Sequence, residues 1–149
     1  MQKQLRIGLI TISLAAALIA GSALAVSPRV QVAEITVGEH ERAMLKSFQR
    51  MVRASVQQMY IQKVRGGPFL ISASLVDLKT KRGDFGLQAT AKVVATLRHK
   101  KSGALIGSIQ GKATAVASGG STVEAQDSAL KAAVESALSN VPDVLSREH

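Results

Sequence analysis

The chain has 149 residues, of which 19 are Lys or Arg and 10 are Asp or Glu, so its formal net charge is +9. It contains no cysteine, which excludes disulfides, thiolate metal sites and a lipid anchor carried on cysteine. Aromatic residues make up only 3% of the chain, which counts against nucleic-acid binding because such proteins add aromatic stacking surfaces to their basic patches.

The first 25 residues have the layout of a bacterial secretory signal peptide. Lys3 and Arg6 precede an uncharged apolar run over residues 7–20, and small residues at Ala23 and Ala25 fit the signal peptidase. An uncleaved membrane anchor is the alternative, but the strongly apolar part is shorter than the roughly 20 residues that span a bilayer. We therefore expect a periplasmic or secreted protein with no stable membrane span after cleavage.

Cleavage after residue 25 leaves residues 26–149 as the working protein. Loss of Lys3 and Arg6 lowers its formal charge to +7, which favours anionic surroundings. A chain of this length without disulfides is long enough to be stabilised by one hydrophobic core. We expect residues 26–149 to form a single domain.

A short strand and a helix are predicted first in this domain. Residues 30–35 show the mixed alternation of a short strand, and Thr36-Val37-Gly38-Glu39 has the spacing of a helix capping box. The apolar residues that follow recur every three or four positions, which predicts one buried helical stripe. This stripe consists of Met44, Leu45, Phe48, Met51, Val52, Val56 and Met59. The opposite face carries Arg42, Lys46, Gln49, Arg50, Arg53 and Gln57.

Three strands joined by hairpins are predicted after Gly66-Gly67-Pro68 ends the helical segment. Period-two alternation begins at Phe69, and a polar turn is expected over residues 79–84. The second strand, residues 85–98, should bury its odd-numbered side chains from Leu87 to Leu97. After a turn over residues 99–103, the third strand should bury Leu105, Gly107, Ile109, Gly111, Ala113, Ala115 and Ala117, a face of unusually small side-chain volume.

An alanine-rich helix is predicted after the strands. Ser121-Thr122-Val123-Glu124 forms a second capping box, and helical spacing continues until Pro142 stops the element. Because this helix and the preceding strand both bury small residues, we expect their backbones to pack closely against each other.

The element order β-α-β-β-β-α predicts an α+β fold, with two helices packed on one face of a mostly antiparallel sheet of about four strands. The other face of the sheet suits either a solvated surface or a docking surface. It carries Gln88, Thr90, Lys92, Thr96, Gln110, Lys112 and Thr114.

Basic residues should gather at one end of the sheet, because successive hairpin turns alternate between its two ends. Lys63 and Arg65 precede the first hairpin strand, and His99, Lys100 and Lys101 connect the second strand to the third. These five residues are a possible anion-binding site. The alternative is that charged turns keep the hairpin ends soluble and deter edge pairing. For the basic face of the first helix we likewise expect solvation rather than contact with a membrane.

No catalytic constellation is recognisable. Glu39-His40-Glu41 lacks the second histidine of the H-E-x-x-H pattern, and residues 107–111 lack the spacing of a serine nucleophile elbow. Asp77 and Asp84 flank the predicted turn, where three basic residues would keep both carboxylates ionised. The glycine-rich turns match no phosphate-binding loop. We expect no enzyme activity, no cofactor and no metal.

From about residue 30 to residue 145 the layout resembles small α/β accessory domains of the bacterial cell envelope. These include the amino-terminal domain of the Tol-Pal translocation protein and the lipoprotein activators of penicillin-binding proteins. The matching features are an apolar strand like residues 69–78, a turn like Lys101-Ser102-Gly103, a strand of small residues and an alanine-rich helix like residues 125–138. The resemblance implies a periplasmic domain that binds other envelope proteins without catalysis. It transfers no site residue, and the cysteine of the lipoproteins is missing here.

Two functional hypotheses follow. The leading one is an exported, non-catalytic envelope accessory protein that binds a protein partner. The alternative is a basic protein that binds lipopolysaccharide, anionic lipid or, with less support, extracellular nucleic acid. Salt distinguishes them, because binding to a polyanion falls steeply as ionic strength rises. A hydrolase with an unrecognised site is a third and weaker possibility.

Overall fold

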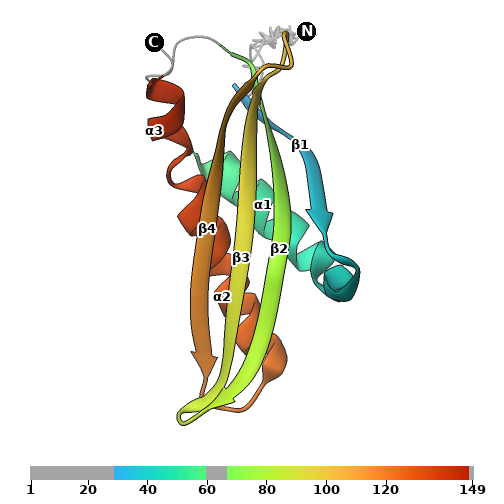
Figure 1. Ribbon diagram of the computed structural model, residues 1–149, viewed down its shortest axis with the longest axis vertical. Helices are drawn as coiled ribbons and strands as arrows, with labels where there is room; N and C mark the ends of the chain where they lie inside the picture. The colour runs from blue at the N-terminus through green and yellow to red at the C-terminus, as the bar shows by residue number, and fades with distance from the viewer. Residues whose placement is uncertain (1–28, 60–66, 148–149) are drawn as a thin grey trace, which may run out of the picture.

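The computed structural model describes residues 29–59 and 67–147 (Figure 1). The predicted signal peptide, Lys63 and Arg65 lie outside these residues. The elements in chain order are strand β1 (Val30–Val37), 3-10 helix η1 (Glu39–Met44), helix α1 (Leu45–Gln58), strands β2 (Phe69–Gly83), β3 (Gly86–His99) and β4 (Leu105–Ala117), and helices α2 (Thr122–Leu138) and α3 (Val141–Ser146).

The four strands form one mixed sheet in the order β1-β2-β3-β4. β1 is parallel to β2, whereas β2, β3 and β4 form an antiparallel meander. Helices α1 and α2 lie on the same side of this sheet (Figure 1). The predicted α+β fold, its element order and its mostly antiparallel sheet are confirmed.

The helix-covered face of the sheet is its inner face and holds the hydrophobic core. On β3 the predicted alternation is present: Leu87 is half-buried, and Ala89, Ala91, Val93, Ala95 and Leu97 are buried. Helix α1 adds Phe48 and Val52 to the core. Helix α2 adds Ala125, Ala129, Leu130, Ala133, Val134, Ala137 and Leu138.

The predicted close approach of the alanine-rich helix to the third hairpin strand is present between α2 and β4. An ideal Cβ built on Gly111 would collide with the carbonyl oxygen of Ala133 and lie 2.6 Å from the backbone nitrogen of Ala137. These are backbone atoms that cannot rotate out of the way. Only glycine at position 111 therefore lets helix and strand pack at this distance.

Irregularities of register decide which side chains face inward on three strands. The strand pairing skips Ala33 in β1, Val76 in β2 and Ile106 in β4. Each extra residue reverses the inward and outward alternation on one side of it. The prediction that Leu105 is buried was wrong for this reason, because Leu105 pairs with Arg98 instead of continuing the inner row and is 60% exposed.

Three predicted element ends also differ from the structure. Thr36 is not a helix cap, because β1 continues through Val37 and the Thr36 hydroxyl bonds the Ser74 hydroxyl at 2.7 Å. Residues 79–83 belong to β2, so the turn contains only Asp84 and Phe85. The last predicted helix is divided: α2 ends at Leu138, and Pro142 lies in the first turn of α3.

Candidate functional site

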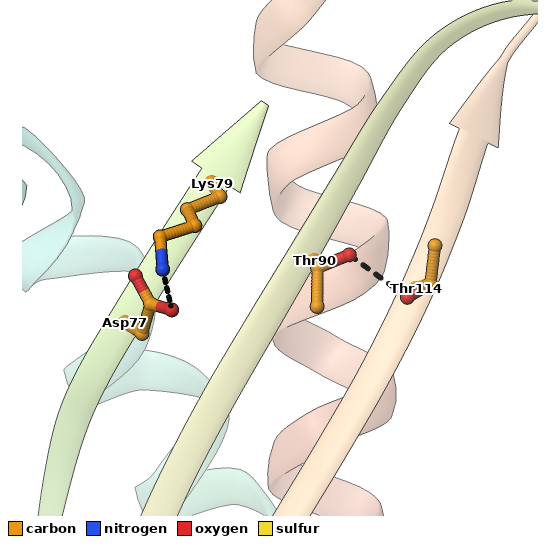
Figure 2. Close-up of polar contacts among 4 residues, drawn as sticks. All are labelled: Asp77, Lys79, Thr90 and Thr114. Carbon is orange, nitrogen blue, oxygen red and sulfur yellow. Dashed lines mark hydrogen bonds and ion pairs between the residues drawn. The ribbon is translucent and has the colours of Figure 1, made fainter. Parts of the chain in front are cut away.

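The outer face of the sheet is the side away from α1 and α2, and none of the described elements covers it (Figure 1). Its side chains form cross-strand rows because the registers of β2, β3 and β4 align. Asp77, Lys92 and Lys112 occupy one row. Lys79, Thr90 and Thr114 occupy the next (Figure 2). We call Asp77, Lys79, Lys92 and Lys112 the outer patch.

Three positive charges stand against one negative charge in the outer patch. The ammonium group of Lys79 forms an ion pair of 2.9 Å with the carboxylate of Asp77, two residues along the same strand (Figure 2). No ion pair with Lys92 or Lys112 occurs within residues 29–59 and 67–147. The net charge of the outer patch is therefore concentrated on Lys92 and Lys112.

Lys92 and Lys112 lie directly opposite each other on β3 and β4. Like charges in directly opposed positions destabilise a pair of strands, and nothing in the hydrophobic core requires lysine at either place. The row consists of Asp77, Lys92 and Lys112, with Lys92 between the other two, and its net charge is positive. An acidic group placed between the two ammonium groups would remove the repulsion.

Two hydroxyl pairs lie on the outer face beside the outer patch. The Thr90 and Thr114 hydroxyls are 2.9 Å apart and link β3 to β4 beside the outer patch (Figure 2). Thr36 and Ser74 make the equivalent pair between β1 and β2. The outer face also carries apolar side chains, since Val94 lies between Ser74 and Gln110 in the row next to Lys92, and Val76 is 53% exposed.

The predicted anion site is only partly within the described residues, because it also includes Lys63 and Arg65. The ring of His99 packs edge-to-face on Phe69, with centroids 5.7 Å apart, and its Nδ1 is buried without a hydrogen-bond partner. The Lys100 ammonium group donates to the side-chain oxygen of Gln31 at 2.8 Å. Lys101 is exposed. Two of the three described residues thus have structural contacts, and the site stays a prediction.

Helix α1 turns its basic side away from the core. Lys46, Arg50 and Arg53 are exposed and follow one another at steps of four and three residues, which places them along one ridge. Arg42, at the end of η1, lies 3.8 Å from Glu39 in an exposed pair. The α1 ridge is a second basic surface, separate from the outer patch.

In the part of the chain that the structure describes, no three His, Cys, Asp or Glu residues are close enough to hold a metal ion. Glu39-His40-Glu41 belongs to η1, and Asp77 faces Lys79 on β2 rather than flanking the turn with Asp84. None of the described helices is both long enough and apolar enough to cross a bilayer.

Sequence reasoning found Lys92 and Lys112 on the outer face but missed Lys79, which it placed in a turn. The two-residue turn could have been recognised from Gly83-Asp84-Phe85-Gly86, in which two glycines bracket two turn residues. With that turn, β2 extends through residue 83 and carries Lys79 onto the sheet. The bulge at Val76, which sets the direction of Lys79, has no comparable signal.

Comparison with known proteins shows a shared fold. The sequence matches no protein-family profile and no curated protein. Among solved structures, the hypothetical protein CT253 of Chlamydia trachomatis aligns with a TM-score of 0.51 at 10% identity, over 79% of this chain and 97% of that one. At such low identity the likeness concerns the fold alone.

Two further structures have TM-scores below 0.5. A candidate lipoprotein from Caulobacter crescentus has a TM-score of 0.48 at 12% identity, with 81% of this chain and 90% of that chain covered. PelC from Paraburkholderia phytofirmans, a dodecamer, has a TM-score of 0.42 at 18% identity, with 70% and 84% covered. These two likenesses concern the fold alone and assign no role to this chain. The finer resemblance to Tol-Pal and penicillin-binding-protein accessory domains stays a prediction.

Proposed function

We propose that this chain is an exported cell-envelope protein without catalytic activity, which binds an acidic protein partner through the outer face of its sheet. The observation that carries the proposal is the outer patch, where Lys92 and Lys112 lie directly opposite each other on a surface that no described element covers. The predicted signal peptide supports export. The hydrophobic core lies wholly on the other face, so the outer face is available for binding.

The outer face is large enough for a specific interface. Strands β2, β3 and β4 have 15, 14 and 13 residues. At about 3.3 Å per residue and about 4.8 Å between strands, their outer face covers on the order of 600 Å². Stable protein interfaces bury about 600 to 1,000 Å² on each partner. A flat partner surface could therefore engage this face without rearrangement of the sheet.

The charge of the outer patch selects the kind of partner. A second copy of this chain, docked face to face, would place lysines against lysines, which costs free energy. A nucleic acid would lack aromatic side chains to stack on, since no Phe, Tyr, Trp or His belongs to the rows of the outer patch. A protein surface with carboxylates matches both the lysines and the hydroxyl pairs.

Site-specific crosslinking in the periplasm tests the proposal. A photoreactive residue is placed at Gln110, which is exposed on the outer face, and in a parallel variant at Gln57, which is exposed on α1. We expect one reproducible crosslinked protein from position 110 and none from position 57. The same protein captured equally from both positions, or no protein from position 110, would contradict the proposal.

Charge reversal supplies the second arm of this test. The double variant Lys92→Glu, Lys112→Glu should abolish the crosslink from position 110. The matched control is Lys46→Glu, Arg50→Glu, which changes the net charge by the same amount on the α1 ridge. Equal loss in both variants would show that net charge, rather than the outer patch, governs binding. A crosslink that survives reversal of the outer patch would place the partner elsewhere.

The dependence of binding on ionic strength distinguishes this proposal from the anion-binding alternative. The α1 ridge is the basic surface within the described residues that would serve that alternative. Binding of a polyanion loses orders of magnitude in affinity over a few-fold rise in salt. A protein interface with a few rim charges changes mainly in its association rate. Affinity for an identified partner should therefore fall only modestly between low and high salt.

A further inference from the structure

The far end of the β2–β3 hairpin exposes an aromatic side chain. Only Asp84 and Phe85 connect the two strands. Phe85 is 87% exposed, the largest exposed fraction of any large hydrophobic residue that the structure describes. The hairpin ends at one extremity of the elongated molecule, below the helices in Figure 1. Phe85 serves no purpose in the core, and a turn at this place does not require an aromatic residue.

The turn is fixed against the neighbouring strand. Gly86 has a φ of +127°, and a Cβ at this position would lie 2.6 Å from the carbonyl oxygen of Ala117, at the end of β4. Both the positive φ and the close approach require glycine. The backbone next to Phe85 is therefore held in place, and the exposed ring is presented by an ordered hairpin.

Apolar and basic side chains accompany Phe85 at this end. Val116, near the end of β4, is 54% exposed, and Val123, in the first turn of α2, is 62% exposed. Lys81 and Arg82 precede the turn, are exposed, and line a shallow hollow of about 280 Å³ together with Phe85 and Val116. We call Lys81, Arg82, Phe85, Val116 and Val123 the hairpin tip.

We infer that the hairpin tip binds the surface of an anionic lipid bilayer, with Phe85 inserted at the boundary of headgroups and acyl chains and with Lys81 and Arg82 against lipid phosphates. Apolar side chains flanked by cations are the pattern of segments that lie in a membrane interface. This surface lies at the end of the sheet, whereas the outer patch lies along its face, so the inference goes beyond the proposed function.

The shape of the hairpin tip favours a membrane over a protein. A two-residue turn at the end of a hairpin presents a small convex surface, whereas a stable protein interface needs about 600 Å² or more on each side. A bilayer has no such requirement, because burial of one ring together with two phosphate contacts adds to the affinity without shape complementarity. Asp84, the acid in the turn, opposes binding and keeps it reversible.

Fluorescence of a single tryptophan tests the inference, because the natural chain contains none. In the Phe85→Trp variant, we expect the emission to shift to the blue when phosphatidylglycerol vesicles are added at low salt. Lipids brominated on their acyl chains should quench it. The matched control is Leu105→Trp, also on an exposed apolar position but at the opposite end of β4. Its emission should not change.

Single substitutions in the natural chain show how much each side chain contributes to membrane affinity. The affinity is measured by co-sedimentation with phosphatidylglycerol vesicles. Phe85→Ala should weaken partition by about tenfold. Lys81→Gln should weaken it by about fivefold, and Asp84→Asn should strengthen it by a similar factor, as expected for one charge near an anionic surface. All three positions are exposed, so the fold should be kept, which circular dichroism would verify.

Several outcomes would overturn the inference. One is absence of a blue shift with phosphatidylglycerol, and another is an equal shift with zwitterionic phosphatidylcholine. A shift that depends on protein concentration without vesicles would assign the hairpin tip to self-association, and one caused by a purified protein partner would assign it to a protein interface. Failure here leaves the crosslinking result at position 110 unaffected, because that experiment contains no residue of the hairpin tip.

Discussion

The two faces of the sheet are formed by the same strands but differ in burial: the inner face is covered by helices, and the outer face is not. On β3, Ala95 and Leu97 are fully buried by the helices, whereas Lys92, between Ala91 and Val93, lies on the uncovered side. Because side chains alternate along a strand, 14 residues encode both a scaffold and a surface. Substitutions on one face should change stability, and substitutions on the other should change binding.

The inner face is also sensitive to volume in a way that the outer face is not. At Gly111 the backbones of β4 and α2 are in contact, so a single added carbon has no room. On the outer face, Lys112 is the next residue along the strand and is exposed. The fold therefore tolerates almost any side chain at position 112 and only glycine at position 111.

The largest expected effect comes from truncating a buried leucine. Leu97→Ala should lower the free energy of unfolding by about 2 to 5 kcal/mol, because Leu97 is fully buried and the cavity left behind cannot close. Leu105→Ala, on the outer face of the adjacent strand, should change it by no more than about 0.5 kcal/mol. Urea denaturation of both variants measures the contrast. Similar losses in the two would mean that the outer face is covered in the folded protein.

A smaller loss is expected when one methyl group is added at the helix–strand contact. Gly111→Ala should destabilise the protein by about 1 to 3 kcal/mol, because the new carbon collides with backbone atoms of α2. Gly119→Ala is the matched control, since no atom lies within 4 Å of the added carbon. It should be neutral or stabilising by up to about 1 kcal/mol. Thermal unfolding would refute the contact if the two variants behaved alike.

Much of the fold could be predicted from the sequence because its strongest signals are local. The alternation of β3, the buried stripe of α1 and the small residues shared by β4 and α2 are direct consequences of period 2.0 and period 3.6. The cap at Ser121 was also correct, since its hydroxyl accepts the backbone N–H of Glu124 at 3.3 Å. The capping box at Thr36 did not form, because Thr36 pairs with Ser74 in the sheet and its hydroxyl bonds the Ser74 hydroxyl.

The remaining errors come from long-range pairing. A bulge depends on the hydrogen bonds between two strands. The residues next to Val76 and Ile106 in the sequence therefore give no signal that the alternation reverses there. The exposure of Leu105 and the position of Lys79 on the outer face both depend on such bulges. Residues 79–83 also resembled a turn because this end of β2 is mostly exposed and its side chains are as polar as those of a loop.

Part of the candidate site could therefore be predicted from the sequence, and part could not. Lys92 and Lys112 follow from simple alternation and were placed on the outer face from the sequence alone. Their direct opposition, which gives the outer patch its charge, depends on the register of β3 against β4. The exposure of Phe85 depends on the exact length of the turn. Both features became visible only with the strand pairing.

The smallest expected change in stability comes from a substitution on the outer face, and it should affect stability and binding in opposite directions. Lys112→Glu replaces a repulsive cross-strand pair with an attractive one, so it should raise the free energy of unfolding by about 0.2 to 1 kcal/mol. The same substitution should weaken binding of an acidic partner, because it puts a carboxylate where the partner's carboxylate would lie. Lys112→Gln should have half the effect on both. A chain that becomes more stable while losing its partner would show that this lysine is kept for binding at the expense of the fold. If stability and binding fall together, the repulsion between Lys92 and Lys112 is not a feature of the folded protein, and the outer patch loses its role.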